Sequence, residues 1–307
     1  MKSSFLFLAT IACAVLLAGC GGGAPPIPET AAVTKSAPEA QAIFDACLKA
    51  HGGAAAYARL HDVNVRFDSH WAALGPKLQP VLSDREHRQG SEERYLPVRG
   101  GYVVGQTHQG PEGTKHVFRR PGTGAVVFYQ PPSAKHRINP DGSDSDPEVS
   151  RAAGLVTDAY SMFLFGPGFF VQRGAKFQTV AGTVDVSGHA CDQLVTTLTP
   201  GFGSTGDKAV LFIDRQDHLL RRVQFTLNAL DSTQGAEVHV ELSAHRQLAG
   251  VMWPTHYVER IDRPVNLAAH EWSLLGFDVN RGESAADLAG PAFTGKAAAP
   301  AKPVVLR

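Results

Sequence analysis

The sequence lacks an excess of charge of either sign. It carries 29 Lys and Arg residues and 29 Asp and Glu residues, so its formal net charge is zero. A nucleic-acid binder, or a protein that reads anionic membranes through a polybasic patch, needs clustered positive charge. We therefore expect no nucleic acid among its partners.

The sequence also lacks a hydrophobic run long enough to cross a bilayer as a helix. Its N-terminal apolar stretch, residues 5–17, is shorter than the roughly 20 residues that a transmembrane helix needs. Because Lys2 precedes it, the stretch is typical of an export signal. Residues 17–20 (Leu-Ala-Gly-Cys) then match the lipobox of bacterial lipoproteins. We predict cleavage before Cys20 and acylation of the Cys20 thiol.

An acylated Cys20 would make a membrane the first partner of this chain. Each buried methylene contributes about 0.8 kcal/mol, so several acyl chains would hold the protein on a bilayer almost permanently. The next residue is Gly21, not the Asp that resembles an inner-membrane retention signal. We expect anchoring in the outer membrane, with the domain facing the periplasm.

Cysteine is scarce, which limits disulfide bonding to one bridge. Of four cysteines, Cys13 lies in the predicted signal and Cys20 at the predicted acylation site. Cys47 and Cys191 remain, in a compartment that permits oxidation. They could form a disulfide or stay as two separate buried thiols, since a bridge requires Cα atoms within about 7 Å of each other.

Sequence motifs of catalysis are missing as well. There is no G-x-S-x-G nucleophile elbow. The G-x-G-x-x-G match at residues 201–206 precedes a strand pattern, whereas a phosphate loop must open a helix, so we predict a hairpin loop. The acidic run 141–146 lacks the later Glu of a calcium loop, and the 13 His residues show no metal-ligand spacing. We expect no enzyme activity, no cofactor and no metal.

Composition divides the chain into four parts. Residues 1–19 form the signal, residues 20–35 a flexible Gly/Ala/Pro tether, residues 36–282 a single domain, and residues 283–307 a disordered Ala/Pro/Lys tail. The domain opens with an amphipathic helix, which we expect to begin with a capping box between Ser36 and Glu39. Its apolar stripe ends before Gly52 and Gly53.

After this helix the hydrophobic period changes from 3.6 to 2. Val63, Val65, Phe67 and Trp71 share one face of the first strand. Eleven further segments read as strands separated by turn signals: 93–98, 102–108, 114–119, 125–130, 177–186, 193–199, 209–214, 219–227, 236–245, 252–261 and 271–279. Short strands in series predict a mainly β fold, an antiparallel meander.

One helix interrupts the meander. Asp146 is suited to cap it and Pro147 to open it. It ends in the aromatic run 162–170, which contains two glycines and a proline. Such a run is either an apolar lid that touches lipid or a helix end buried in the core.

The order of these elements resembles the LolA/LolB-like family of lipoprotein carriers, or outer-membrane lipoprotein-sorting-like proteins. The resemblance rests on weak motifs between residues 37 and 280: the helix end at 51–53, the strand pair 209–214 and 219–227, and the strand start at 250–254. It implies an unclosed β-barrel of about eleven strands, with helices as a lid and a concave apolar face that receives acyl chains.

A strongly curved sheet must fill its concave face with large side chains or leave a cavity. Our candidates for that face are Val63, Val65, Phe67, Trp71, Phe163, Phe165, Phe225, Trp253 and Trp272. An empty face predicts a binder of lipid or lipoprotein acyl chains, with export or lipoprotein-sorting proteins as further partners. A filled face predicts a non-catalytic scaffold or assembly lipoprotein. A hydrolase, the third alternative, would need a nucleophile, a His and an acid to converge in one pocket.

Overall fold

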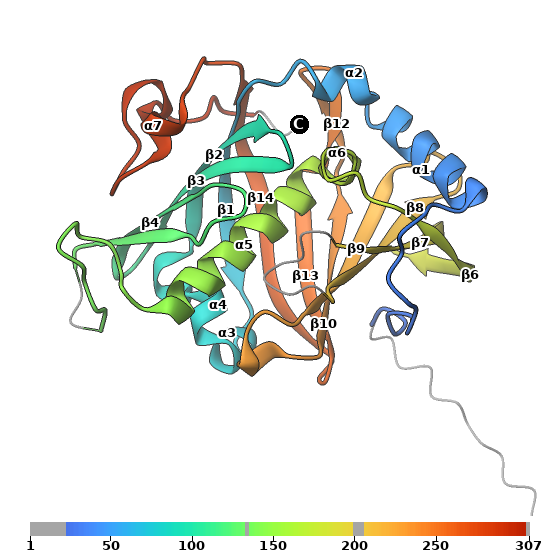
Figure 1. The fold of residues 1–307 in the computed structure, drawn as a ribbon, viewed down its shortest axis with the longest axis horizontal. Helices are drawn as coiled ribbons and strands as arrows, with labels where there is room; N and C mark the ends of the chain where they lie inside the picture. The colour runs from blue at the N-terminus through green and yellow to red at the C-terminus, as the bar shows by residue number, and fades with distance from the viewer. Residues whose placement is uncertain (1–22, 133–134, 199–205, 305–307) are drawn as a thin grey trace, which may run out of the picture.

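The computed structural model describes residues 23–132, 135–198 and 206–304. The predicted signal and Cys20 lie outside these residues, as do residues 201–205 of the predicted hairpin loop. One antiparallel sheet dominates the described part of the chain (Figure 1). Its twelve strands are, in order across the sheet, β5 (Val126–Gln130), β4 (Gly113–Arg119), β3 (Gly101–Gly110), β2 (Gly90–Val98), β1 (Val63–Trp71), β14 (Leu267–Val279), β13 (His256–Arg263), β10 (Ala236–Ser243), β9 (Leu220–Leu227), β8 (Lys208–Asp214), β7 (His189–Thr197) and β6 (Gln178–Val186).

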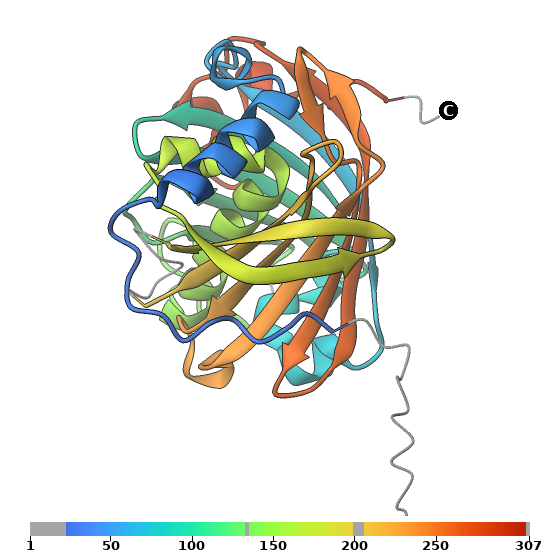
Figure 2. The same cartoon turned by 90° about the vertical axis from the view of Figure 1, so that its right-hand side faces the viewer.

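The sheet is strongly curved but not closed, because its two outermost strands, β5 and β6, do not pair with each other. The mainly β, unclosed antiparallel architecture is therefore confirmed, with twelve strands instead of about eleven. At the centre of the sheet the first and last strands pair, with Val63 opposite Val279. Figure 2 shows the resulting curved wall from the side.

A short separate ribbon consists of β11 (Arg246–Leu248) and β12 (Val251–Trp253). We expected one strand over residues 252–261, but the chain divides it into β12 and β13. The break coincides with Pro254, which has no backbone N–H to donate within a sheet.

The helices are few, and most of them are short. They are α1 (Pro38–Ala50), α2 (Ala54–Tyr57), α3 (Gly75–Leu78), α4 (Pro80–Ser83), α5 (Pro147–Phe165), α6 (Pro167–Gln172) and α7 (Ala285–Leu288), with 3-10 turns at Arg85–His87, Asp231–Thr233 and Gly295–Ala298. The longest, α5, lies across the concave side of the sheet (Figure 1). Among the described residues, no helix is long and apolar enough to cross a membrane.

The two predicted helix caps had different outcomes. The Asp146 carboxylate accepts a hydrogen bond from the Glu148 N–H at 2.8 Å, as expected for the start of α5. The capping box at α1 is wrong, since Ala37 is the N-cap residue and no side chain caps this helix. The Ser36 hydroxyl instead accepts a hydrogen bond from the Phe177 N–H. This bond ties the start of α1 to the start of β6.

The concave face is filled mainly by aromatic side chains. Trp272 stacks between Tyr160 and Tyr257, with ring centroids 5.1 and 5.0 Å away. Phe163 and Phe165, near the end of α5, are 2% and 1% exposed. Of the two interpretations of the aromatic run, the structure has the buried helix end and not an exposed lid.

Residues 23–35, which we expected to form a flexible tether, pack against the outside of the sheet. They contain no helix or strand, yet Ala24, Ile27 and Val33 are buried. The Ala24 N–H donates to Asp262 Oδ1 at 2.9 Å. Small and apolar residues let the backbone lie close to the strands, a feature that composition cannot distinguish from flexibility.

The predicted disordered tail is also ordered as far as residue 304. Leu288 and Ala297 are buried in a small cluster with Leu96 and Val103. Arg94 donates from its guanidinium to the carbonyl oxygens of Ala297 and Ala299, at 3.1 and 2.8 Å. These backbone acceptors give the Ala-rich segment a fixed place on the outer face of the sheet.

Cys47 and Cys191 are both buried and free, so the disulfide alternative does not hold in this structure. Cys47 belongs to the main core on the concave side. Cys191 lies in a cluster with Val186 and Val210, which points to the opposite side of the same sheet. A sheet therefore separates the two thiols.

Candidate functional site

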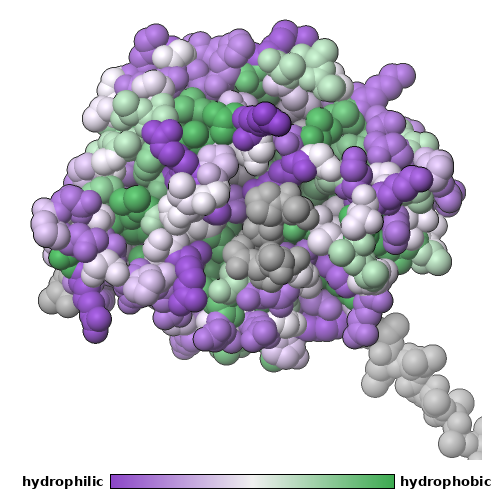
Figure 3. All heavy atoms as spheres, in the orientation of Figure 1, coloured by the Kyte–Doolittle hydropathy of each residue, from purple (hydrophilic) through white to green (hydrophobic). Residues whose placement is uncertain are grey.

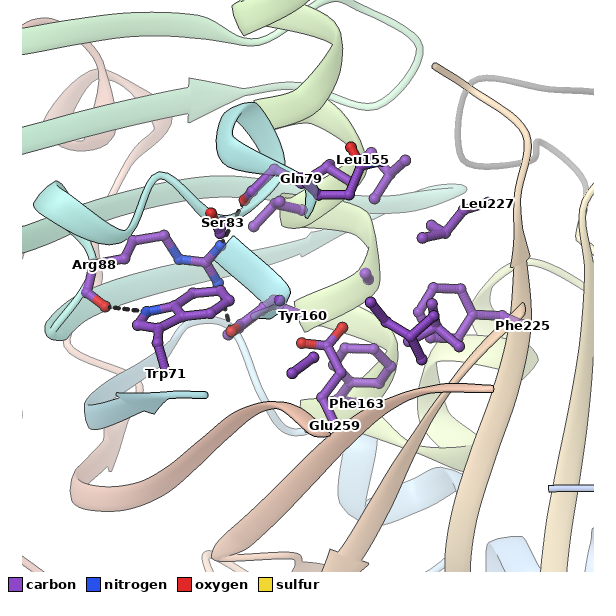
Figure 4. A pocket seen from close by; sticks show the side chains of 17 residues that line it. Trp71, Gln79, Ser83, Arg88, Leu155, Tyr160, Phe163, Phe225, Leu227 and Glu259 are labelled. Atoms are coloured by element: carbon purple, nitrogen blue, oxygen red, sulfur yellow. Dashed lines mark hydrogen bonds between the residues drawn. The ribbon is translucent and has the colours of Figure 1, made fainter. Parts of the chain in front are cut away.

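A cavity remains between α5 and the concave face of the sheet (Figure 4). Helix α5 contributes Leu155, Val156 and Ala159, and β9 contributes Phe225 and Leu227. Its volume is about 80 Å³. That is room for a few water molecules but well below the roughly 300–1,000 Å³ of a pocket for a drug-sized ligand.

A second, open hollow lies where α2 and α6 approach each other. Its volume is about 510 Å³, and its lining includes Tyr57, Tyr102 and Phe165. Gly168 is required here, since a Cβ atom at this position would lie 2.5 Å from the Tyr57 ring. The two hollows adjoin successive parts of the helical segment, residues 155–163 for the cavity and 165–172 for the open hollow.

The predicted concave-face residues separate into three groups. Trp71, Phe163 and Phe225 line the cavity, and Phe165 lines the open hollow. The others line neither hollow and belong to the packed core: Val63, Val65, Phe67, Trp253 and Trp272. The first strand therefore has the predicted inward face, but only its last member, Trp71, reaches the cavity.

A buried arginine beside the cavity was not predicted. Arg88 is 4% exposed and donates to the Tyr160 hydroxyl and, at 3.1 Å, to the Leu82 carbonyl oxygen. Its guanidinium lies 5.1 Å from the Trp71 ring centroid and 4.9 Å from that of Tyr160. The Trp71 indole N–H in turn donates to the Arg88 carbonyl oxygen at 2.7 Å. Arg88 thus joins the end of β1 to helix α5, as Figure 4 shows.

The same network continues to His270. Tyr160 and His270 Nδ1 are 3.0 Å apart, and the His270 ring is stacked between Trp71 and Trp272. Burial, followed by the nearby positive charge of Arg88, holds the pKa of His270 well below its usual range. Since the Tyr160 hydroxyl accepts from Arg88, it can donate a hydrogen bond to Nδ1 of a neutral His270, whose own proton is then on Nε2. Within the described residues, Nε2 has no hydrogen-bond partner.

Glu259 places a carboxyl group on the wall of the cavity. It lies on β13 between Tyr257 and Ile261, and its nearest ionic neighbour is His270, with Nδ1 3.9 Å from Oε2. No hydrogen bond reaches this carboxyl group from the described residues. Burial raises the pKa of Glu259 from 4.5 to about 7. Near neutral pH the group can therefore donate or accept a hydrogen bond inside a cavity whose lining is mainly apolar.

Glu93, another buried carboxyl group on this side, has a different role. It accepts hydrogen bonds from the Tyr95 hydroxyl, from Ser91 Oγ at 2.8 Å and from Gln106 Nε2 at 3.1 Å. Burial raises the pKa of Glu93, and these donors oppose the rise. Its oxygens are satisfied internally, so Glu93 stabilises the fold and is not available to a ligand.

Metal binding has no support in the described part of the chain, where no group of three His, Cys, Asp or Glu residues could hold an ion. The acidic run 141–146 forms local turns, in which Asp141 Oδ1 accepts from the Ser143 N–H at 2.9 Å. His239 is buried, and its Nδ1 lies 2.8 Å from Asp262 Oδ2 beneath the N-terminal segment.

No family model and no curated protein matches the sequence. Several solved structures follow a similar course. A DUF1329 family protein from Desulfovibrio piger has 11% identity and a TM-score of 0.49, over 81% of this chain and 97% of that one. A putative outer membrane lipoprotein-sorting protein domain from Vibrio parahaemolyticus has 11% identity and a TM-score of 0.42, over 81% and 96%. A LolA superfamily protein from Nitrosomonas europaea has 12% identity and a TM-score of 0.43, over 78% and 93%. At these identities the similarity says nothing about what this chain binds.

The sequence held a partial signal for the polar part of the site. Along β13, Glu259 alternates in step with Tyr257 and Ile261, so it lies on the same inward face. An acidic residue therefore interrupts an apolar run on this face. A search restricted to large apolar residues misses it. Arg88 follows a 3-10 turn without hydrophobic periodicity, and no pattern in the sequence points to its burial.

Proposed function

We propose that this chain is a lipoprotein of the bacterial envelope that binds an apolar, lipid-like ligand between α5 and the concave face of its sheet. The observation that carries this proposal is the cavity in an otherwise filled interior, with the Glu259 carboxyl group on its wall. Mainly apolar walls with a few polar groups are the usual composition of a ligand site. The ligand would place its hydrocarbon along α5 and a hydrogen-bonding group beside Glu259.

Binding an acyl chain requires the cavity to enlarge. The four-residue helices α3 and α4 supply part of its wall through Gly75, Gln79 and Leu82. Few buried contacts and short elements are features of segments that open at low free-energy cost. Each methylene that enters would contribute about 0.8 kcal/mol, which offsets the cost of moving these segments.

Native mass spectrometry of the Cys20→Ser protein, purified without detergent, tests the proposal. We expect a co-purified phospholipid or fatty acid, or uptake of added fatty acid. The Val156→Trp variant should lower this occupancy several-fold, because Val156 is half-buried and lines the cavity.

Val149→Trp is the matched control for Val156→Trp. Val149 is also a half-buried valine on α5, but it does not line the cavity. The Val149→Trp variant should leave lipid occupancy unchanged. A protein that emerges free of lipid and ignores added fatty acid would contradict the proposal.

A scaffold or assembly lipoprotein is the second candidate, and one observation favours it. The concave face is largely occupied by side chains of the chain itself, and the remaining cavity is about 80 Å³. Such a barrel can serve as a rigid surface for protein contacts without binding lipid. An apo mass in the experiment above, together with a stable protein partner captured through the anchored protein, would select this function.

The anchoring part of the proposal rests on the lipobox at residues 17–20. Acylation at Cys20 and placement in the outer membrane, facing the periplasm, follow from that motif and from Gly21. Lipoprotein-sorting or export proteins would then be the natural partners. Mass spectrometry of the N-terminal peptide from the native protein tests the acylation directly.

A further inference from the structure

Three exposed hydrophobic side chains belong to one end of the molecule. Leu74 and Leu78, at the two ends of the α3 turn, are 58% and 51% exposed, and Val265 is 43% exposed. Val265 lies in the turn between β13 and β14. On the face drawn in Figure 3, hydrophobic surface is scattered in separate patches among hydrophilic side chains.

A packing contact places the α3 turn on the strand that begins just after Val265. A Cβ atom added to Gly75 would lie 3.2 Å from the Ala269 Cα, so α3 rests directly on the start of β14. Ala269 is four residues beyond Val265, a distance of at most about 13 Å along a strand. Figures 1 and 2 both place α3 and the β13–β14 turn at the same end of the barrel. We call Leu74, Leu78 and Val265 the apolar rim.

The N-terminal segment is fixed beside the apolar rim. Gly23 lies against Asn266, since a Cβ atom at Gly23 would be 2.7 Å from Asn266 Nδ2. The Ala24 N–H donates to Asp262 at 2.9 Å, and Arg263 donates to the Ala24 carbonyl oxygen at 3.5 Å. Cys20 precedes Gly23 by three residues, which cannot span more than about 11 Å.

We infer that the apolar rim lies on the bilayer that holds the acyl chains of Cys20. This inference rests on the proposed lipid anchor. With so short a connection, the membrane surface must come close to Asn266, which directly follows the exposed Val265 of the rim. Gly75, Gln79 and Ala269 also line the cavity, so a ligand could pass between membrane and cavity at this end.

The charges around the rim indicate which membrane surface it contacts. Lys77 and Asp231 are exposed there with opposite signs. Arg263 is paired with Glu237, and Asp262 with His239. Because the rim carries no excess of positive charge, contact should depend on the anchor and on apolar burial, and not on anionic lipids.

Fluorescence quenching in vesicles tests this inference. The acylated protein carrying Leu78→Cys or Val265→Cys is labelled with an environment-sensitive fluorophore and reconstituted into phosphatidylcholine vesicles that contain a doxyl-labelled lipid. We expect quenching several-fold stronger than for Val171→Cys. Val171 is the matched control, because it is 43% exposed but lies on α6, away from α3 in Figure 1. Adding phosphatidylglycerol should not change the result.

A variant without the apolar rim provides the second measurement. Leu74→Asp combined with Leu78→Asp changes only exposed side chains and should reduce quenching at position 265 at least twofold, whereas Val171→Asp should not. Mass spectrometry of the N-terminal peptide separates the outcomes. Acylated Cys20 with equal quenching at positions 78 and 171 overturns the orientation alone. A Cys20 without acyl groups overturns the anchor and the orientation together.

Discussion

At the residue scale, the cavity is marked by one carboxyl group that receives no hydrogen bond from the described residues and whose pKa burial raises more than the charge of Arg88 lowers it. Glu259 has no hydrogen-bond donor among the described residues, and His270 beside it is held neutral by burial and by Arg88. Burying a carboxylate without a partner costs free energy, and the folded state avoids the cost by keeping the proton. A group retained at such cost is a candidate for ligand recognition.

The pH dependence of stability should show this cost. The pKa of Glu259 is 4.5 in the reference state and about 7 in the folded protein. Between these values the folded state binds more protons than the unfolded state, so the free energy of unfolding falls as the pH rises, by roughly 3 kcal/mol in all. Glu259→Gln should remove this fall and make the protein more stable than the native chain at pH 8. Urea unfolding at pH 4.5 and pH 8 measures the difference.

Glu271→Gln is the control for that experiment. Glu271 is an exposed carboxyl group on the neighbouring strand, 3.6 Å from His256, and its loss should change stability by less than about 1 kcal/mol at either pH. If Glu259→Gln destabilises the protein at pH 8, the carboxylate has a stabilising partner and our interpretation of the cavity fails.

At the scale of the elements, α5 lines the cavity with residues between Leu155 and Phe163 and reaches the open hollow at its last residue, Phe165. Its start is set by sequence-local chemistry, with Asp146 as N-cap and Pro147 in the first turn. Its end is set by tertiary packing, where Phe165 stacks on Tyr102 with centroids 4.1 Å apart.

Removal of the α5 cap should have a modest and specific effect. Asp146→Ala leaves the Glu148 N–H without its acceptor, and we expect a loss of about 1 kcal/mol in the free energy of unfolding. Asp146→Asn keeps an acceptor oxygen and should lose only a few tenths of that value. Equal losses in the two variants would show that the charge of Asp146, and not its hydrogen bond, supports the helix.

At the scale of the whole molecule, the curved sheet separates two sets of buried residues. The concave side holds the main core with Cys47, and the convex side holds Cys191 under residues 27–33. Because side chains pack against both of its faces, most of the sheet lies in the interior of the molecule between two buried clusters. Its N-terminal and C-terminal segments both lie on the outside, where each satisfies polar groups of the strands.

The two cysteines report on the integrity of this sheet. Burial raises the pKa of the Cys191 thiol to about 12 and that of Cys47 further still. In the Cys20→Ser protein, both thiols should resist a thiol reagent at pH 8 under native conditions and both should react in denaturant. Labelling that requires a reductant in denaturant would instead reveal a disulfide, in conflict with the arrangement of the sheet.

Local patterns predicted the strands, the inserted helix and the inward face of Val63, Val65 and Phe67, because alternation and capping depend on neighbouring residues. They did not predict that the two terminal segments pack against the sheet. Residues 23–35 and 283–304 read as flexible from composition, but their partners, such as Asp262 and Arg94, are distant in sequence. The same limit applies to the site, since Arg88, Tyr160 and Glu259 meet only after the sheet curves around α5.

By itself, the sequence determined the mainly β architecture, the position of α5 in the chain and the lipobox that motivates the anchor. Each of these depends on residues within a few positions of one another. Only the tertiary structure decided that the concave face is filled except for a small cavity, that no hydrogen bond from the described residues reaches Glu259 and that Gly23 lies beside the apolar rim. These features depend on the register between distant strands and on how closely side chains pack, and neither is encoded in any local pattern.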